Sequence, residues 1–209
     1  MTRASRTLTA GFIVIFGLAG FDRTAFAGQA EALTITLHVH NYARVPSAVL
    51  TRAEGEATRI YRALGVDLMW VALTAASAYS PPETLSKPNL TVILMSGVMA
   101  ERKRAAGDVM GAAPGTLEQR GRLAYVFYTR VALLAHGAGN DAESKILGHV
   151  MAHEMGHLLL PANSHTAGGV MRADWDSEHL LRMVKGLLQF TPEQGELIRS
   201  HVSSALPQS

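Results

Sequence analysis

Residues 153–165 read HEMGHLLLPANSH, and this stretch decides how the rest of the chain is interpreted. His153 and His157 are four residues apart, so on a helix both imidazoles project from one face, about one turn apart. Two imidazoles at this spacing can reach a single zinc ion. Glu154 lies on an adjacent face, where its carboxylate can take a proton from a zinc-activated water without binding the metal. We therefore expect one Zn²⁺ per chain, with Glu154 as general base.

The third metal ligand must come from beyond this helix. His149 continues the stripe, but it lies eight residues before His157. That is about 12 Å along a helix axis, so a straight helix cannot hold all three histidines around one ion. Pro161 ends the helix, and His165 follows in a loop that can fold back toward the metal. We predict His165 as the third ligand, and Glu178 on the next helix is the alternative.

The segments before the motif predict four strands, a helix and a long loop. Residues 97–122 are Gly-rich without a clear period, which indicates a long loop. Ser47 is the expected N-cap of a helix that Gly65 ends. Apolar residues that alternate or run continuously predict four strands, at residues 32–40, 66–73, 89–96 and 122–135.

The remaining segments predict helices. Asn140 with Glu143 three residues later forms a capping box for a helix that can run to Leu160. A short helix is expected near residues 177–188, and Thr191 is the expected cap of the last one. The order of strand, helix, three strands, long helix, loop and helices predicts a single α/β domain.

The first 27 residues have the layout of a secretory signal peptide. Arg3 and Arg6 precede the apolar run Leu8–Gly20, and small residues stand at −3 and −1 of a cleavage point after Ala27. About 13 apolar residues fall short of the roughly 20 that a membrane-spanning helix needs. We therefore expect an exported protein, secreted or periplasmic, with no stable membrane span after cleavage.

The predicted mature domain, residues 28–209, is close to neutral. The full chain has 19 basic and 17 acidic residues, and residues 1–27 contain three of the former and one of the latter, which leaves 16 of each. This balance does not predict nucleic-acid binding. The chain has no cysteine, which excludes disulfides, thiolate zinc ligands and thiol catalysis. Any metal must therefore bind His, Asp or Glu.

The motif and the residues after it resemble the metzincins, a clan of zinc peptidases. The clan has His-Glu-x-x-His on a helix, a third histidine on a loop, and a methionine in a turn beneath the metal. The corresponding residues here are His153, Glu154, His157, His165 and Met171. Two positions depart from the clan's pattern, because Leu160 stands where the clan has glycine and Asn163 where it has the third histidine.

The resemblance implies a mixed sheet with a backing helix, a long active-site helix and a short helical C-terminal part. Together with the predicted signal peptide, it implies an exported zinc-dependent peptidase that acts on peptides or proteins. Two alternatives stay open, a gluzincin-like peptidase with Glu178 as third ligand and a non-catalytic exported zinc-binding module. Glu154 argues against the second, because structural zinc sites need no base and usually close all four positions with protein ligands.

Overall fold

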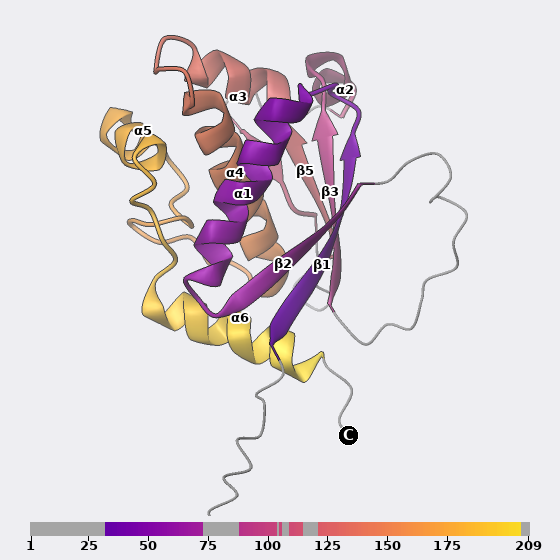
Figure 1. Ribbon diagram of the computed structural model, residues 1–209, viewed down its shortest axis with the longest axis vertical. Helices are drawn as coiled ribbons and strands as arrows, with labels where there is room; N and C mark the ends of the chain where they lie inside the picture. Colours follow the sequence, from indigo (N-terminus) through magenta and orange to yellow (C-terminus); the bar gives the residue numbers. More distant parts are fainter. Residues whose placement is uncertain (1–31, 73–87, 104, 106–108, 115–120, 206–209) are drawn as a thin grey trace, which may run out of the picture. The chain divides into compact units, whose positions relative to one another are not determined.

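The computed structural model describes residues 32–72, 88–103, 105, 109–114 and 121–205. These residues belong to one compact unit, Ala32–Ser209 (Figure 1). The predicted signal peptide lies outside the described residues. Within the described part of the chain, no helix combines the length and apolar character that a membrane crossing requires.

A five-stranded sheet forms one layer of the domain. Its strands are β1 (Leu33–Asn41), β2 (Val66–Ala72), β3 (Asn89–Met95), β4 (Gly111–Ala112) and β5 (Leu123–Phe127). Their order across the sheet is β2-β1-β3-β5-β4, so β3 is central. All neighbouring pairs are parallel except the last, in which β4 runs antiparallel to β5 along the edge. The sheet is therefore mixed, as predicted.

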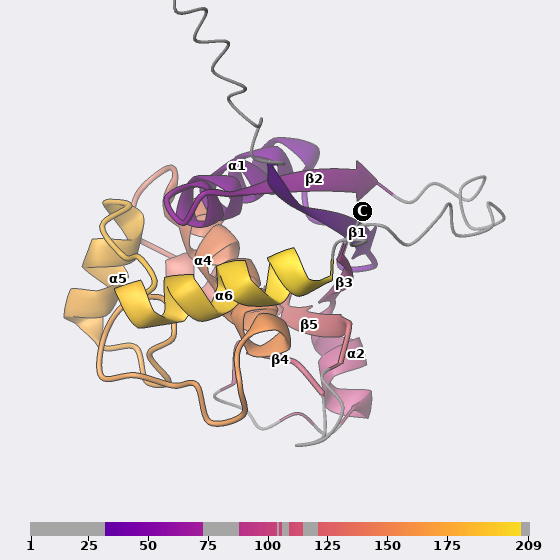
Figure 2. The same cartoon turned by 90° about the horizontal axis from the view of Figure 1, so that it is seen from below.

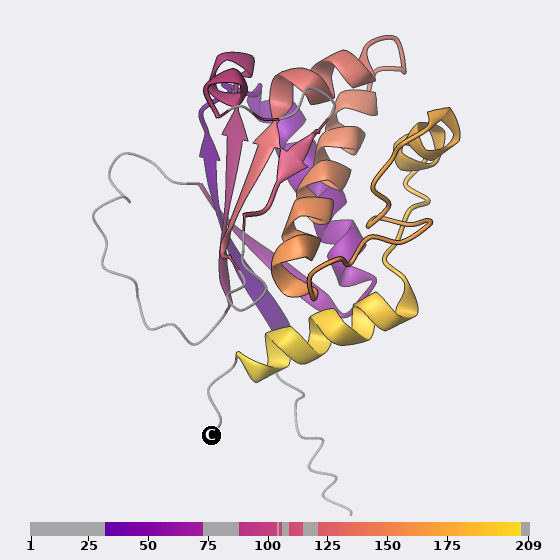
Figure 3. The same ribbon diagram turned by 180° about the vertical axis from the view of Figure 1, so that it is seen from behind.

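Two helices cover one face of this sheet, and the second carries the motif. α1 (Ser47–Arg62) connects β1 to β2, and α4 (Ala142–Leu159) packs beside it (Figures 1 and 3). Gly148 allows the two helices to approach closely, because a Cβ there would lie 2.6 Å from the carbonyl oxygen of Ala53. The core between the helices and the sheet includes the fully buried side chains Ile35, Leu37, Ile60, Leu147 and Met151.

Four shorter helices complete the domain. They are α2 (Gly97–Arg102), α3 (Tyr128–Ala135), α5 (Ser177–Val184) and α6 (Pro192–Ser204). α6 crosses the C-terminal end of α4, as seen from below in Figure 2. This arrangement places a C-terminal helix next to the loop that follows the motif.

Two predictions about the middle of the chain are wrong. Residues 97–122 are not one long loop, because they contain α2 and the edge strand β4. The strand expected over 122–135 ends at Phe127, and α3 follows it directly. Val131 and Ala135 are buried at helical spacing while Leu133 between them is exposed, so this apolar stretch follows the helical period rather than the strand period.

The predicted helix caps are only partly correct. Ser47 is the first residue of α1, and Pro46, with φ fixed at −56°, precedes the helix as its N-cap. The capping box expected before α4 does not form, because the Glu143 carboxylate accepts a hydrogen bond from the Tyr128 hydroxyl instead. The cap at Thr191 is confirmed: its Oγ1 accepts from the Gln194 backbone N–H at 3.3 Å.

Candidate metal centre

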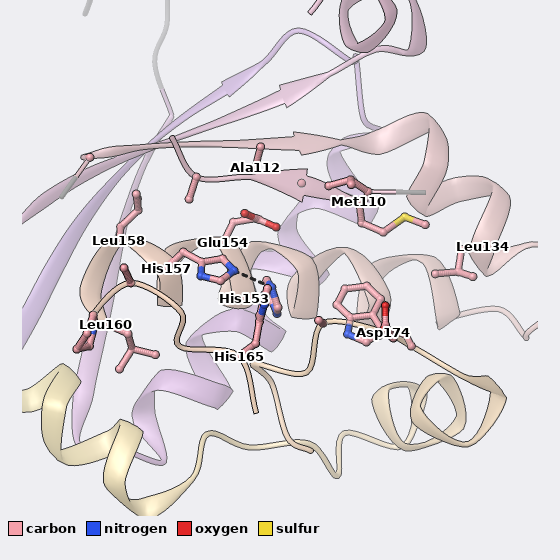
Figure 4. A pocket seen from close by; sticks show the side chains of 18 residues that line it. Met110, Ala112, Leu134, His153, Glu154, His157, Leu158, Leu160, His165 and Asp174 are labelled. Atoms are coloured by element: carbon pink, nitrogen blue, oxygen red, sulfur yellow. Dashed lines mark hydrogen bonds between the residues drawn. The ribbon is translucent and has the colours of Figure 1, made fainter. Parts of the chain in front are cut away.

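Three histidines from α4 and the loop after it converge on one point (Figure 4). The ligand nitrogens of His153, His157 and His165 all lie within 4.8 Å of one another, and Nε2 of the first two are 3.0 Å apart. Two nitrogens bound tetrahedrally to one zinc at 2.0–2.1 Å would be about 3.4 Å apart. The three side chains therefore fit a single ion, and a set of imidazole donors suits zinc.

Further contacts fix the orientation of two of these rings. His153 Nδ1 lies 2.8 Å from the Val170 carbonyl oxygen. Because a carbonyl only accepts, Nδ1 carries the hydrogen and Nε2 offers its lone pair to the metal position. Ser164 Oγ lies 3.3 Å from His157 Nδ1, where it can accept from that nitrogen. The Trp175 ring meets the His153 ring edge-on, with 5.9 Å between centroids.

Burial keeps these two histidines neutral. It lowers the pKa of His153 to about 4 and that of His157 to about 4, and the neighbouring imidazoles add to the effect. Only the neutral ring can donate a lone pair to a metal, so both are in the metal-binding form at neutral pH. His165 is exposed and completes the cluster from the loop.

The loop that carries His165 reverses the chain immediately after α4. Leu160 is extended, Pro161 follows, and Asn163 has φ of 59°. A left-handed residue turns the backbone sharply, and asparagine tolerates this conformation better than most residues. Asn163 therefore makes the turn that returns the chain to α4, and the histidine follows two residues later.

α6 holds this loop in place through one buried side chain. Gln194, only 6% exposed, donates from Nε2 to the Ser164 carbonyl oxygen at 3.1 Å and to Thr166 Oγ1 at 3.4 Å. Its Oε1 accepts from the Thr191 backbone N–H at 3.1 Å. The same glutamine thus caps α6 and binds the residues on both sides of His165.

Met171, in the segment after His165, packs against α4 at Gly156, the residue before His157. Its side chain is fully buried, and its sulfur lies 2.5 Å from the position that a Cβ on Gly156 would take. Gly156 is therefore required for the methionine to pack against α4. The backbone of this segment closes on itself, since the Thr166 N–H donates to the Met171 carbonyl oxygen at 3.0 Å. The segment supports the helix directly before His157.

Glu154 lies between β4 and the histidines (Figure 4). It is 5% exposed, and a Cβ on Gly111 would lie 2.5 Å from its Oε1. Among the described residues, its carboxylate has no hydrogen bond or ion pair, and burial raises its pKa to about 8. A buried carboxyl without a cation is costly, and such groups concentrate where proton transfer or metal binding takes place.

A cavity of about 890 Å³ opens over Glu154 and the three histidines. One wall is formed by residues 109–113, which include β4, and the other by residues 160–162 and 173–175. Among the described residues that line it, none is lysine or arginine. The volume suits a bound segment of a larger molecule or a small ligand.

The alternative ligand does not join this cluster. The Glu178 side chain is 79% exposed and faces Arg182 at 4.0 Å. His149 is not part of the cluster either, as expected from its distance along the helix, and it is buried on the side of α4 that faces α1. Sequence reasoning missed the contacts of Gly111 and Trp175. Gln194 had a local signal, since it stands three residues after Thr191, but that signal indicates only the cap.

Comparison with known proteins adds a structural likeness. No family model and no curated protein matches the chain. Among solved structures, it is similar to the crystal structure of archaemetzincin from Methanopyrus kandleri, with 17% sequence identity, a TM-score of 0.47, and coverage of 85% of this chain and 99% of that chain. Identity and TM-score are both low, so the assignment of the site rests on the residues of this chain.

Proposed function

We propose that this protein is an exported zinc-dependent peptidase. One observation carries the proposal: three convergent histidines and a buried, unpaired Glu154 share the wall of one cavity. Structural zinc sites usually use four protein ligands, whereas catalytic sites use three and leave one position open. Among the described residues the donor set holds three histidines, and all three line the cavity. Export rests on the layout of residues 1–27.

The chain's own residues supply the proton transfers of hydrolysis. When bound, zinc acts as a Lewis acid on a carbonyl and lowers the pKa of water. The Glu154 carboxylate would accept a proton from the attacking water and deliver it to the leaving nitrogen. Burial raises the pKa of this carboxyl to about 8 in the metal-free protein, and a zinc cation bound by the adjacent histidines would lower it toward the ionised form that a general base needs. His153 is held by the Val170 carbonyl and does not need to move.

The edge strand supports a peptide as substrate. Gly111 and Ala112 of β4 line the cavity, and β4 is the last strand of the sheet. An extended peptide can add to such an edge by main-chain hydrogen bonds, which depend little on its sequence. A peptide bound along β4 would pass over Glu154 and the histidines.

The test compares the two candidate third ligands. The purified exported protein should hold close to one zinc per chain and hydrolyse members of a generic peptide library. His165→Ala should weaken zinc binding by more than about 10²-fold, because loss of a ligand exceeds the 10–100-fold cost of losing an outer-shell partner. Glu178→Ala should leave zinc affinity unchanged.

Three outcomes would redirect the proposal. Loss of zinc in Glu178→Ala alone would favour the gluzincin-like arrangement. Zinc binding without hydrolysis of any peptide would favour the non-catalytic module. An unprocessed N-terminus, measured by mass spectrometry of the protein from its native host, would contradict export with cleavage after Ala27.

A further inference from the structure

The cavity has different chemistry at its two ends. Figure 4 shows Leu158 and Leu160 to one side of the three histidines, and Asp174, with the apolar side chains of Met110 and Leu134, to the other. Pro161 and Ala162, which follow Leu160 in the chain, also line the cavity. A peptide that lies across the cavity with its scissile bond at the histidines would therefore meet leucines at one end, and a carboxylate among apolar side chains at the other.

The Asp174 carboxylate is free to bind a ligand. It is exposed, and among the described residues it has no hydrogen bond or ion pair. The charged residues next to it in the chain do have partners. Arg172 Nη2 donates to Asp176 Oδ2 at 2.9 Å, and Arg172 Nη1 donates to His179 Nδ1 at 2.7 Å. The nearest arginine in the sequence thus binds other partners, and no cation pairs with Asp174 among the described residues.

The backbone on both sides of Asp174 is anchored. Arg172 forms a backbone bridge with Thr166, next to His165. Trp175 donates from Nε1 to the Arg172 carbonyl oxygen at 2.9 Å, and its ring packs on His153. Asp174 therefore sits on a segment tied to two of the three histidines, so its position relative to the metal site is set by the fold.

The charges of the cavity favour a cationic group at this end. The described lining residues include two carboxylates, Glu154 and Asp174, and no lysine or arginine. Glu154 is buried against Gly111 and is assigned to proton transfer, which leaves Asp174 as the accessible negative charge. A carboxylate at the mouth of a cavity attracts cations more strongly than one on an open surface, because the low-dielectric walls focus its field.

We propose that Asp174 binds a lysine or arginine side chain of the substrate, next to the scissile bond. The apolar end at Leu158 and Leu160 then takes a hydrophobic residue on the opposite side of that bond. This inference rests on the proposed peptidase function and names its substrate class: peptides with one basic and one apolar residue flanking the cleaved bond.

The test measures a preference rather than total activity. Peptides identical except for lysine or norleucine at the residues flanking the cleaved bond are compared by kcat/KM. The protein should prefer lysine on one side by at least about 5-fold, as expected for a partly exposed charge-assisted pair. Asp174→Asn should abolish this preference, and Asp174→Lys should reverse it toward a glutamate-containing peptide.

A matched control and a binding measurement distinguish a failure of the Asp174 inference from a failure of the proposed peptidase function. Glu178→Gln removes an exposed carboxylate from the next helix and should keep both the activity and the preference. Calorimetric binding of the same peptides to zinc-loaded Glu154→Gln, and to the double variant with Asp174→Asn, should show the same loss of lysine preference without turnover. Hydrolysis with no lysine preference, or a preference that survives in Asp174→Asn, overturns this inference alone. If no peptide is hydrolysed or bound, the proposed function fails and the inference with it.

Discussion

Two buried glutamates lie on opposite sides of α4, and their surroundings differ completely. Glu56, 3% exposed, projects from α1 toward the back of α4, and Glu154, 5% exposed, faces the cavity. Burial raises the pKa of both carboxyls. At Glu56 this effect is outweighed by Arg59 Nη2 at 2.6 Å and Lys145 Nζ at 2.5 Å, so its pKa falls below the usual value. At Glu154 nothing offsets burial, and the pKa rises to about 8.

The same residue types therefore join two helices on one side of α4 and border the cavity on the other. Histidines of α4 accompany both glutamates: His149 Nδ1 lies 3.8 Å from Glu56 Oε1, and His153 and His157 line the same cavity as Glu154. His149 donates locally to the Lys145 carbonyl oxygen and faces α1 rather than the cavity. A paired buried charge joins two helices, whereas an unpaired one is retained only where a substrate or metal completes it.

The largest expected effect is on peptide hydrolysis, which should depend on Glu154 and not on Glu56. Glu154→Gln should reduce peptide hydrolysis by at least about 10²-fold with zinc still bound, because the amide cannot accept the proton. Glu56→Gln should keep hydrolysis near that of the parent but lower the melting temperature, because Lys145 and Arg59 lose their partner. Kinetics, zinc content and thermal unfolding of both variants check this. Equal loss of hydrolysis in the two variants would remove the distinction.

The second prediction concerns the pH dependence of the metal-free protein. The raised pKa of Glu154 means that the folded chain keeps this proton where the unfolded chain has released it. The contribution of this proton to the free energy of unfolding is thus fully present below pH 4.5 and is lost as the pH rises through 8. From pH 6 to 8, the free energy of unfolding should fall by about 2 kcal/mol relative to Glu154→Gln, at about 1.36 kcal/mol per unit.

The control for this measurement is Glu56. Its lowered pKa contributes stability that is present above pH 4.5 and lost only at lower pH, so Glu56→Gln should show the parent's slope between pH 6 and 8. His153 and His157 are present in every variant, so their contributions cancel in the difference. Urea unfolding in the presence of a chelator gives the slopes, and an unchanged slope in Glu154→Gln would contradict the assignment.

The third prediction compares Gly111, which lies against Glu154, with Gly148, which lies against Glu56. Gly111→Ala should lower kcat by about 10-fold with zinc retained, because the new Cβ would displace the Glu154 carboxylate from its place 2.5 Å away. Gly148→Ala should instead lower stability, since its Cβ would lie 2.7 Å from Glu56 Cβ and 2.6 Å from the Ala53 carbonyl oxygen. Kinetics and denaturant unfolding distinguish the two. A loss of kcat in Gly148→Ala alone would show that the two sides are coupled.

The smallest expected effect concerns support of the third histidine. Gln194→Leu removes the donor to Ser164 and Thr166, so the zinc dissociation constant should rise by several-fold up to about 10-fold, the low end for outer-shell groups. Thr191→Ala removes only the helix cap and should cost about 1 kcal/mol of stability with little change in zinc affinity. Competition with a fluorescent chelator measures both. Equal zinc affinities in the two variants would mean that Gln194 acts only on the helix.

The sequence predicted those features that depend on local spacing. Hydrophobic periodicity, and the residues that begin or end an element, lie within a few positions of one another. They predict the helix with His153 and His157, the first three strands and the Thr191 cap, and the structure confirms these elements. The approach of His165 followed from Pro161 and the chain reversal, although ligation itself stays a prediction. β4 was missed because its two residues pair with β5 only in the folded sheet. The contact of Gln194 with Ser164 spans 30 residues, and no local pattern encodes it.

The contact between Gln194 and Ser164 also has a consequence for the order of synthesis. His153 and His157 leave the ribosome together, as parts of α4. Gln194, whose side chain binds the loop around His165, is synthesised only with α6, 30 residues after Ser164. An unfinished chain would therefore expose a loose pair of histidines rather than a complete site. If the three histidines bind zinc as proposed, the site gains its full support for His165 only after translation has passed residue 194, and zinc should bind an unfinished chain less tightly than the complete one.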